Sequence, residues 1–108
     1  MATITKDILD TVRDRLVSAF HPNRIILFGS QARGDADGRS DLDLLIICPV
    51  KGSRRQLQLQ MDRSLKGLGL ARDIVILSPE EFERDRQIPG TIARPASKEG
   101  IVLYERLE

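Results

Sequence analysis

The chain has 108 residues, 41% of them hydrophobic, with 17 basic and 16 acidic side chains. This length predicts one domain, residues 1–108, with a hydrophobic core. The near-neutral charge argues against binding duplex nucleic acid through its phosphates, and the 4% aromatic content argues against a base-stacking surface. The one cysteine cannot form an internal disulfide.

The first residues carry no basic segment followed by an apolar one, so we expect no signal peptide. No apolar run approaches the roughly 20 residues that a membrane-spanning helix needs. We therefore expect a cytoplasmic protein without a membrane anchor.

The chain starts with an amphipathic pattern that predicts a helix over 5–20, ended by Pro22. The apolar run 24–28 then predicts a buried strand that ends at Gly29. The expected buried stripe of the helix is Ile8, Val12, Leu16 and Ala19, widened by Leu9 and Phe20.

Residues 30–40 are small, polar or glycine, with Gly34 and Gly38 as breakers, and this predicts a turn region. The run 41–48 predicts a second strand, and we interpret Cys48 as one of its buried residues rather than as a nucleophile.

Ser53 is placed to cap a helix that Gly67 and Gly69 end. Its expected apolar stripe is Leu57, Met61, Leu65 and Leu68.

The run 72–77 predicts a third strand, followed by a helix with Ser78 as its N-cap and Pro79 in its first turn. A last short helix near 95–99 ends at Gly100. The order helix, strand, turn, strand, helix, strand, helix predicts an α/β (α+β) fold, a small mixed β-sheet flanked by helices.

Two aspartates open the second strand. Asp41 and Asp43 point the same way, because successive strand side chains alternate between faces. Such a pair repels, and one carboxylate keeps its proton unless a cation neutralises both. Mg²⁺ suits the pair, since it is held by one or two carboxylates together with substrate phosphates. If the third strand is a neighbour, Asp73 joins them, and three acids suit a two-metal site.

The segment after the first strand predicts phosphate binding. Gly29 lets the backbone approach an anion closely, and the N–H groups of the turn 30–33 point toward it. The Ser30 hydroxyl and the Arg33 guanidinium can donate to phosphate oxygens. A P-loop is excluded, because the segment lacks the Gly-Lys-Ser/Thr ending.

Gly29-Ser30, ten residues, and then Asp41-Leu42-Asp43 resemble the signature of the DNA polymerase β-type nucleotidyltransferase superfamily. The segments 27–34, 40–44 and 98–105 resemble its minimal nucleotidyltransferases, which include the MNT antitoxins of HEPN/MNT toxin–antitoxin systems. The resemblance covers nearly the whole chain and implies a polymerase β-like nucleotidyltransferase core.

The resemblance also implies a mechanism. Asp41, Asp43 and Asp73 are then the ligands of two Mg²⁺ ions, and Gly29, Ser30 and Arg33 hold the phosphates of ATP. The implied reaction transfers AMP from ATP to a hydroxyl with release of pyrophosphate. The favoured acceptor is a tyrosine of a HEPN ribonuclease toxin, bound in a hetero-oligomer with this chain as the antitoxin.

Two alternatives stay open. One is a transferase for a small molecule of the aminoglycoside type that needs a second subunit. The other is a non-catalytic antitoxin, a binding module that neutralises a partner by contact. Single residues also have simpler interpretations: Asp73 as an exposed acid paired with Arg72 or with a helix end, Arg33 as a surface ion-pair donor, and Lys51, Arg54 and Arg55 as a solvated face.

Overall fold

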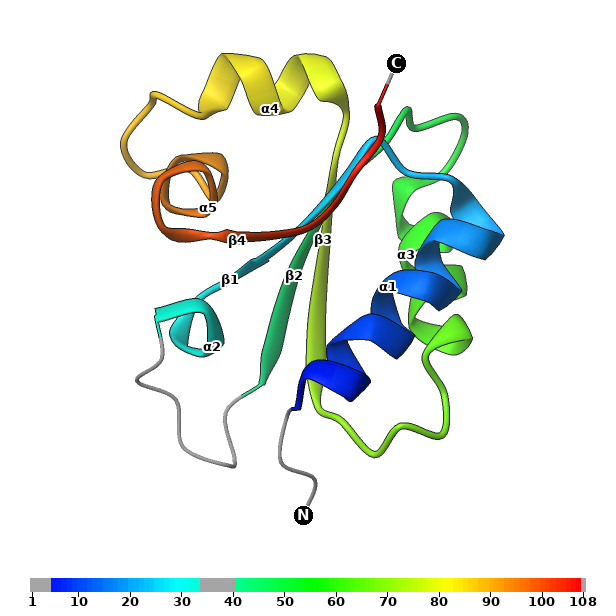
Figure 1. Ribbon diagram of the computed structural model, residues 1–108. Coiled ribbons are helices and arrows are strands. Elements are labelled where there is room, and N and C mark those ends of the chain that lie inside the picture. Colours follow the sequence, from blue (N-terminus) through cyan, green and yellow to red (C-terminus); the bar gives the residue numbers. More distant parts are fainter. Residues whose placement is uncertain (1–4, 34–40, 108) are drawn as a thin grey trace.

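A four-stranded sheet with helices on both of its faces forms the centre of the protein (Figure 1). The computed structural model describes residues 5–33 and 41–107, except for the side chains of Ser30 and Arg33. In chain order the elements are α1 (Lys6–Phe20), β1 (Arg24–Phe28), α2 (Ser30–Arg33), β2 (Leu42–Ile47), α3 (Arg54–Ser64), β3 (Arg72–Leu77), α4 (Pro79–Asp85), α5 (Ala93–Glu99) and β4 (Ile101–Glu105).

The sheet has the strand order β3-β2-β1-β4 and is mixed, as the sequence predicts. β1 pairs antiparallel with both β2 and β4, whereas β2 and β3 are parallel. The parallel pair requires a crossover connection, which α3 provides.

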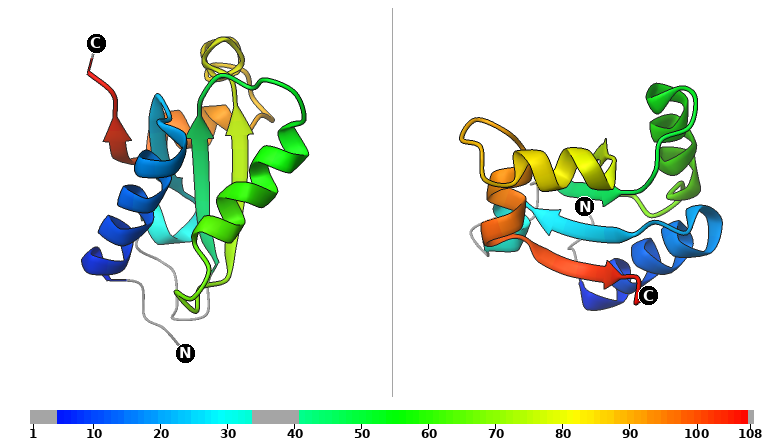
Figure 2. Two further views of the ribbon diagram at one scale, coloured as in Figure 1. Left: turned by 90° about the vertical axis from the view of Figure 1, so that its right-hand side faces the viewer. Right: turned by 90° about the horizontal axis from the view of Figure 1, so that it is seen from above.

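Two apolar clusters fix the helices to the sheet. α1 and α3 cover one face with Val12, Leu16, Met61 and Leu65. α4 and α5 cover part of the other face, where Phe82 and two alanines pack on β1 and β2 (Figure 2). β2 is buried from Leu44 to its end, because it is a central strand with helices on both sides.

All three predicted strands are confirmed, each within a residue of its expected ends, and Cys48 is buried directly after β2. Burial raises the pKa of its thiol. The Thr5, Ser53 and Ser78 side chains each accept a hydrogen bond from the first turn of the helix that follows. Within the described residues, no helix is long and apolar enough to cross a membrane.

One expectation about burial and two about element ends are wrong. Ala19 is exposed rather than part of the buried stripe. α3 ends at Ser64, before the two glycines, because the next backbone N–H groups bond only three residues back and tighten the last turn. The Arg15 guanidinium from α1 binds the carbonyls of Ser64 and Lys66 at 3.3 and 3.0 Å. α5 begins at Ala93, two residues early.

The strand β4 is absent from the predicted pattern. Ile101 and Val102 are about half exposed, and a register shift interrupts the pairing with β1, so no alternation marks the strand in the sequence. The predicted breakers Gly34 and Gly38 lie outside the described residues.

Gly100 joins α5 to β4 at a point of close packing. A Cβ atom there would meet the Ala96 carbonyl oxygen and Ile26 Cγ2 well under the 3.0 Å limit of real contacts. We expect Gly100→Ala to lower the free energy of unfolding by about 1–3 kcal/mol in urea denaturation, because overpacking costs this much. The exposed Lys98→Ala should change it by less than about 0.5 kcal/mol. Equal unfolding midpoints for the two variants would contradict the close packing.

Glu81 connects α4 to α3 in a pH-dependent way. Its carboxylate accepts the Ser78 backbone N–H at 2.8 Å and lies 2.9 Å from the Arg54 guanidinium. The Ser78 N–H holds the pKa of Glu81 below its usual range, burial opposes this, and Arg54 adds to the lowering. The interaction therefore stabilises the fold at neutral pH, and the stabilisation is lost as the pH falls through the usual glutamate range to the lower folded pKa.

Glu81→Gln should accordingly be less stable than wild type at pH 7, with the difference closing in acid. Urea denaturation between pH 7 and pH 3 measures this. Glu80→Gln is the matched control, since Glu80 is exposed and lies in the same helical turn. Parallel stability curves for the two variants across this range would rule out the proposed linkage.

Candidate active site

Three strand ends meet at one edge of the sheet. β1 is antiparallel to β2, and β2 is parallel to β3, so the end of β1 lies beside the starts of β2 and β3 (Figure 1). In this register Asp43 stands opposite Phe28 on one side and Asp73 on the other. The sheet therefore brings together Asp43, Asp73 and Gly29, which directly follows Phe28.

The two aspartates of the second strand differ in their surroundings. Asp41 is exposed and directly precedes β2, whereas Asp43 is the second residue of β2 and is half-buried. Asp43 shares its face with Leu45, which packs in the cluster under α4 and α5. The carboxylate thus lies on the face that these helices cover farther along the strands.

Gly29 lies directly against Asp43. Its φ of +75° is in the left-handed region that favours glycine. A Cβ atom there would collide with Oδ2 of Asp43, far inside normal contact distance. Only glycine allows both this backbone conformation and this close approach, which explains why position 29 is a glycine.

The predicted turn after Gly29 is confirmed as α2. The Ala32 N–H donates to the Gly29 carbonyl at 3.2 Å and closes the turn. The side chains of Ser30 and Arg33 lie outside the described part of the chain, so their roles as phosphate donors stay predictions.

Asp73 is exposed at the second position of β3. The simpler interpretation paired it with Arg72, but the Arg72 guanidinium instead binds Asp62, with Nε 2.9 Å from Oδ1. Arg54 does not belong to a purely solvated face either, because it donates to the Ile76 carbonyl and pairs with Glu81.

The carboxylates at this edge suit Mg²⁺ chemically. Among the described residues, no three His, Cys, Asp or Glu side chains form a group that could hold a metal ion. However, Mg²⁺ is typically held by only one or two carboxylates plus substrate phosphates. Asp43 and Asp73 occupy neighbouring positions in the strand register and provide such a pair. The full set of Asp41, Asp43 and Asp73 stays a prediction.

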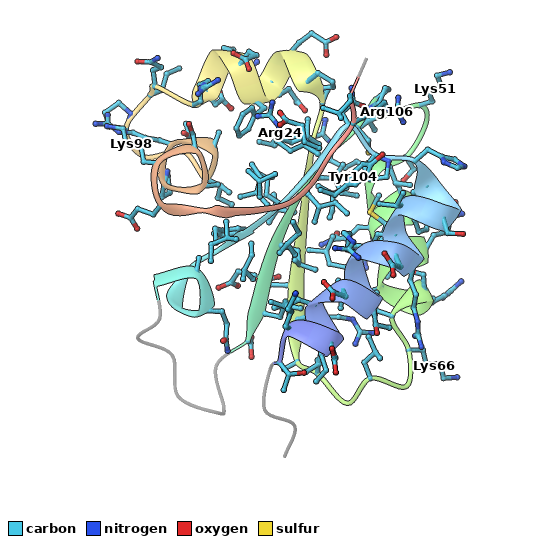
Figure 3. The ribbon with its side chains drawn as sticks, in the orientation of Figure 1. Arg24, Lys51, Lys66, Lys98, Tyr104 and Arg106 are labelled. Atoms are coloured by element: carbon cyan, nitrogen blue, oxygen red, sulfur yellow. The ribbon has the colours of Figure 1, made fainter. Side chains whose placement is uncertain are left out.

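A cavity of about 230 Å³ lies at the opposite end of the sheet, between the strands and α4. Arg24 and Arg106 line it, far from α2 (Figure 3). Arg24 is bound to Glu105 at 2.7 Å and lies 5.6 Å from the ring centre of Phe82. Because Arg24 already has these partners within the protein, the acidic strand edge is the better candidate site.

The mixed sheet with helices on both faces, and with aspartates at one edge beside Gly29, is typical of a nucleotidyltransferase domain. The chain belongs to the nucleotidyltransferase domain family, whose model matches residues 9–104.

Two curated relatives come from Methanocaldococcus jannaschii. "Putative protein adenylyltransferase MJ0604" is 36% identical over 84 residues, which cover 75% of this chain and 77% of the relative. "Putative protein adenylyltransferase MJ0141" is 50% identical over 42 residues. The second match spans 39% of this chain and only 36% of that relative.

Solved structures share the fold. A putative nucleotidyltransferase from Sulfolobus solfataricus has a TM-score of 0.64 at 22% identity and covers 93% of this chain and 79% of its own. A toxin–antitoxin crystallised with AMP-PNP has a TM-score of 0.69 at 18% identity, with coverages of 91% and 73%. A mutant of the toxin–antitoxin MntA-HpeT has a TM-score of 0.62 at 18% identity, with coverages of 93% and 72%.

The packing of Gly29 against Asp43 can be tested with Gly29→Ala. The added methyl group must displace the carboxylate, so we expect the affinity for Mn²⁺, measured by electron paramagnetic resonance, to fall about tenfold, as when the support of a metal ligand is lost. Gly52→Ala is the matched control, because Gly52 has a φ of +79° but nothing lies within 4 Å of its Cβ position. An equal loss of affinity in both variants would assign the effect to backbone strain alone.

Proposed function

We propose that this chain is a metal-dependent adenylyltransferase that transfers AMP from ATP to a hydroxyl group and releases pyrophosphate. The observation that carries the proposal is the strand register that places Asp43 between Phe28 and Asp73, with Gly29 against its carboxylate. One edge of the sheet thus carries carboxylates, which we propose bind metal, and a glycine turn, which we propose binds phosphate.

Gly29 and α2 bind the triphosphate of ATP in this proposal. The absence of a side chain at Gly29 lets a phosphate approach the backbone, and the start of the helical turn α2 directly follows and offers backbone N–H groups to it. The side chains of Ser30 and Arg33 are the expected additional donors to the β- and γ-phosphates. Holding the triphosphate in this way orients the α-phosphorus for attack.

The three aspartates bind the metal ions and accept the proton of the acceptor hydroxyl in this proposal. Asp41, Asp43 and Asp73 would hold two Mg²⁺ ions, which would neutralise the charge of the triphosphate and lower the pKa of the acceptor hydroxyl. Asp73 is the exposed member of the pair in register and accepts the hydroxyl proton. The acceptor oxygen then bonds to the α-phosphorus, and the bond between the α-phosphorus and the bridging oxygen to the β-phosphate breaks, so pyrophosphate leaves.

The acceptor that we propose is a tyrosine of a HEPN ribonuclease toxin held in a complex with this chain. Two kinds of similarity support a protein acceptor: the relatives named as protein adenylyltransferases and the structures named as toxin–antitoxins. In the MntA-HpeT mutant two aspartates separated by one residue are replaced by glutamate. Asp41 and Asp43 have the same spacing.

The proposal is tested with ATP labelled at its α-phosphate, Mg²⁺ and a purified HEPN-domain toxin as the candidate partner. We expect label on a tyrosine of the partner. The double variant Asp41→Ala, Asp43→Ala should reduce labelling at least about 100-fold, because the charge of the triphosphate is no longer neutralised. The exposed pair Asp7→Ala, Asp14→Ala on α1 is the matched control and should label normally.

Neutralisation of the partner is measured with the same proteins. If the partner stays unlabelled and both wild type and the Asp41→Ala, Asp43→Ala variant still neutralise it, the enzymatic proposal is wrong. The chain would then be a binding module that neutralises its partner by contact. Label that appears on an added aminoglycoside, but not on the partner, would favour the small-molecule transferase.

A further inference from the structure

Among the strands that the structure describes, β3 has a neighbour on one side only, and polar side chains of α3 bind its outer edge. The Arg54 guanidinium donates to the Ile76 carbonyl at 2.9 Å. The Gln58 amide donates to the Ile74 carbonyl at 2.6 Å. At the start of the strand the donor and acceptor change places: Arg72 of β3 donates hydrogen bonds to Asp62 of α3.

These three contacts follow one regular spacing. Arg54, Gln58 and Asp62 are four residues apart on α3, and their partners in β3 are two residues apart. Four helical residues rise about 6.0 Å and two strand residues about 6.6 Å, so the two repeats nearly match. α3 runs beside β3 in the opposite direction (Figure 2, left). We call this set, Arg54–Ile76, Gln58–Ile74 and Asp62–Arg72, the α3–β3 zipper.

The Asp62–Arg72 contact has two hydrogen bonds, where the other two contacts have one each, and it lies beside the candidate site. Arg72 donates to the Asp62 carboxylate at 2.9 Å, to the Asp62 carbonyl at 2.8 Å and to the Leu70 carbonyl at 3.1 Å. Its side chain is only 13% exposed. Charged hydrogen bonds of this kind are about twice as strong as neutral ones.

The contact is placed to control Asp73. Arg72 directly precedes Asp73 and stands opposite Leu42, the residue before Asp43. The Leu42 N–H donates to the Ala71 carbonyl at 2.9 Å at the same end of the pair. An edge strand is held by one neighbour only, so its first residues separate easily unless another contact anchors them.

We propose that the α3–β3 zipper, through its Asp62–Arg72 contact, holds Asp73 in register with Asp43 for adenylyl transfer. Arg72 and Asp62 are then positioning residues, since they act through the backbone of β3 and not on substrate. The inference rests on the proposed function and extends it to residues that the sequence motifs do not include.

The test compares Arg72→Met with Arg15→Met. Both variants remove guanidinium bonds to carbonyls around the end of α3, but Arg15 reaches Ser64 and Lys66 from α1, whereas Arg72 is itself a residue of β3. Arg72→Lys is the conservative variant that keeps the charge. Hydrogen exchange at the amides of 72–74, Mn²⁺ binding and the rate of AMP transfer are measured for each, alongside urea stability.

We expect Arg72→Met to raise exchange at 72–74, to weaken Mn²⁺ binding about tenfold and to lower kcat more than it changes KM for ATP. Arg72→Lys should recover part of each loss, and Arg15→Met should match wild type in all three despite lower stability. If Arg72→Met binds Mn²⁺ and transfers AMP as wild type does, the positioning role of Arg72 is wrong, whereas the proposed function stands. Equal losses in the two methionine variants would assign them to general stability. A wild-type protein that transfers no AMP would overturn the proposed function and this role with it.

Discussion

The register of β2 between its two neighbours is the constraint on which the candidate site depends. Side chains alternate along a strand, so a slip of one residue would turn Asp43 toward α1 and α3 and bring Leu44 to the other face. Burial of an unpaired carboxylate costs several kcal/mol, and Leu44 would lose its fully buried position. The hydrophobic core therefore fixes the face of the sheet on which the carboxylate lies.

The distribution of covering helices explains why the acids occupy the starts of the strands. Apolar side chains of β2 begin to be buried on both faces from Leu44 onward, whereas Asp41 is exposed and Asp43 is half-buried. Carboxylates at the fully covered middle would lose their hydration, and carboxylates beyond the sheet would lose their common register. The edge gives both, partial hydration and a fixed relation between neighbouring strands.

The strand that carries Asp73 depends on a different kind of interaction. β2 is held by a strand on each side, whereas β3 pairs with β2 alone among the described strands, and polar side chains of α3 bind its outer edge. Covering the edge in this way also removes free carbonyl groups that could pair with another chain. The two acids in register are thus supported unequally, Asp43 by the core and Asp73 by hydrogen bonds and an ion pair.

The local features can be predicted from the sequence: three strands from their apolar runs, caps at Ser53 and Ser78, and the motif that combines Gly29 with the two aspartates of the second strand. These depend on periodicity and on hydrogen bonds across a few residues. The folded chain was needed to show that Asp73 stands beside Asp43, that β4 completes the sheet, and that α3 ends early and closes the edge of β3. Such relations join segments far apart in the chain, and their free energy comes from packing that no local pattern records.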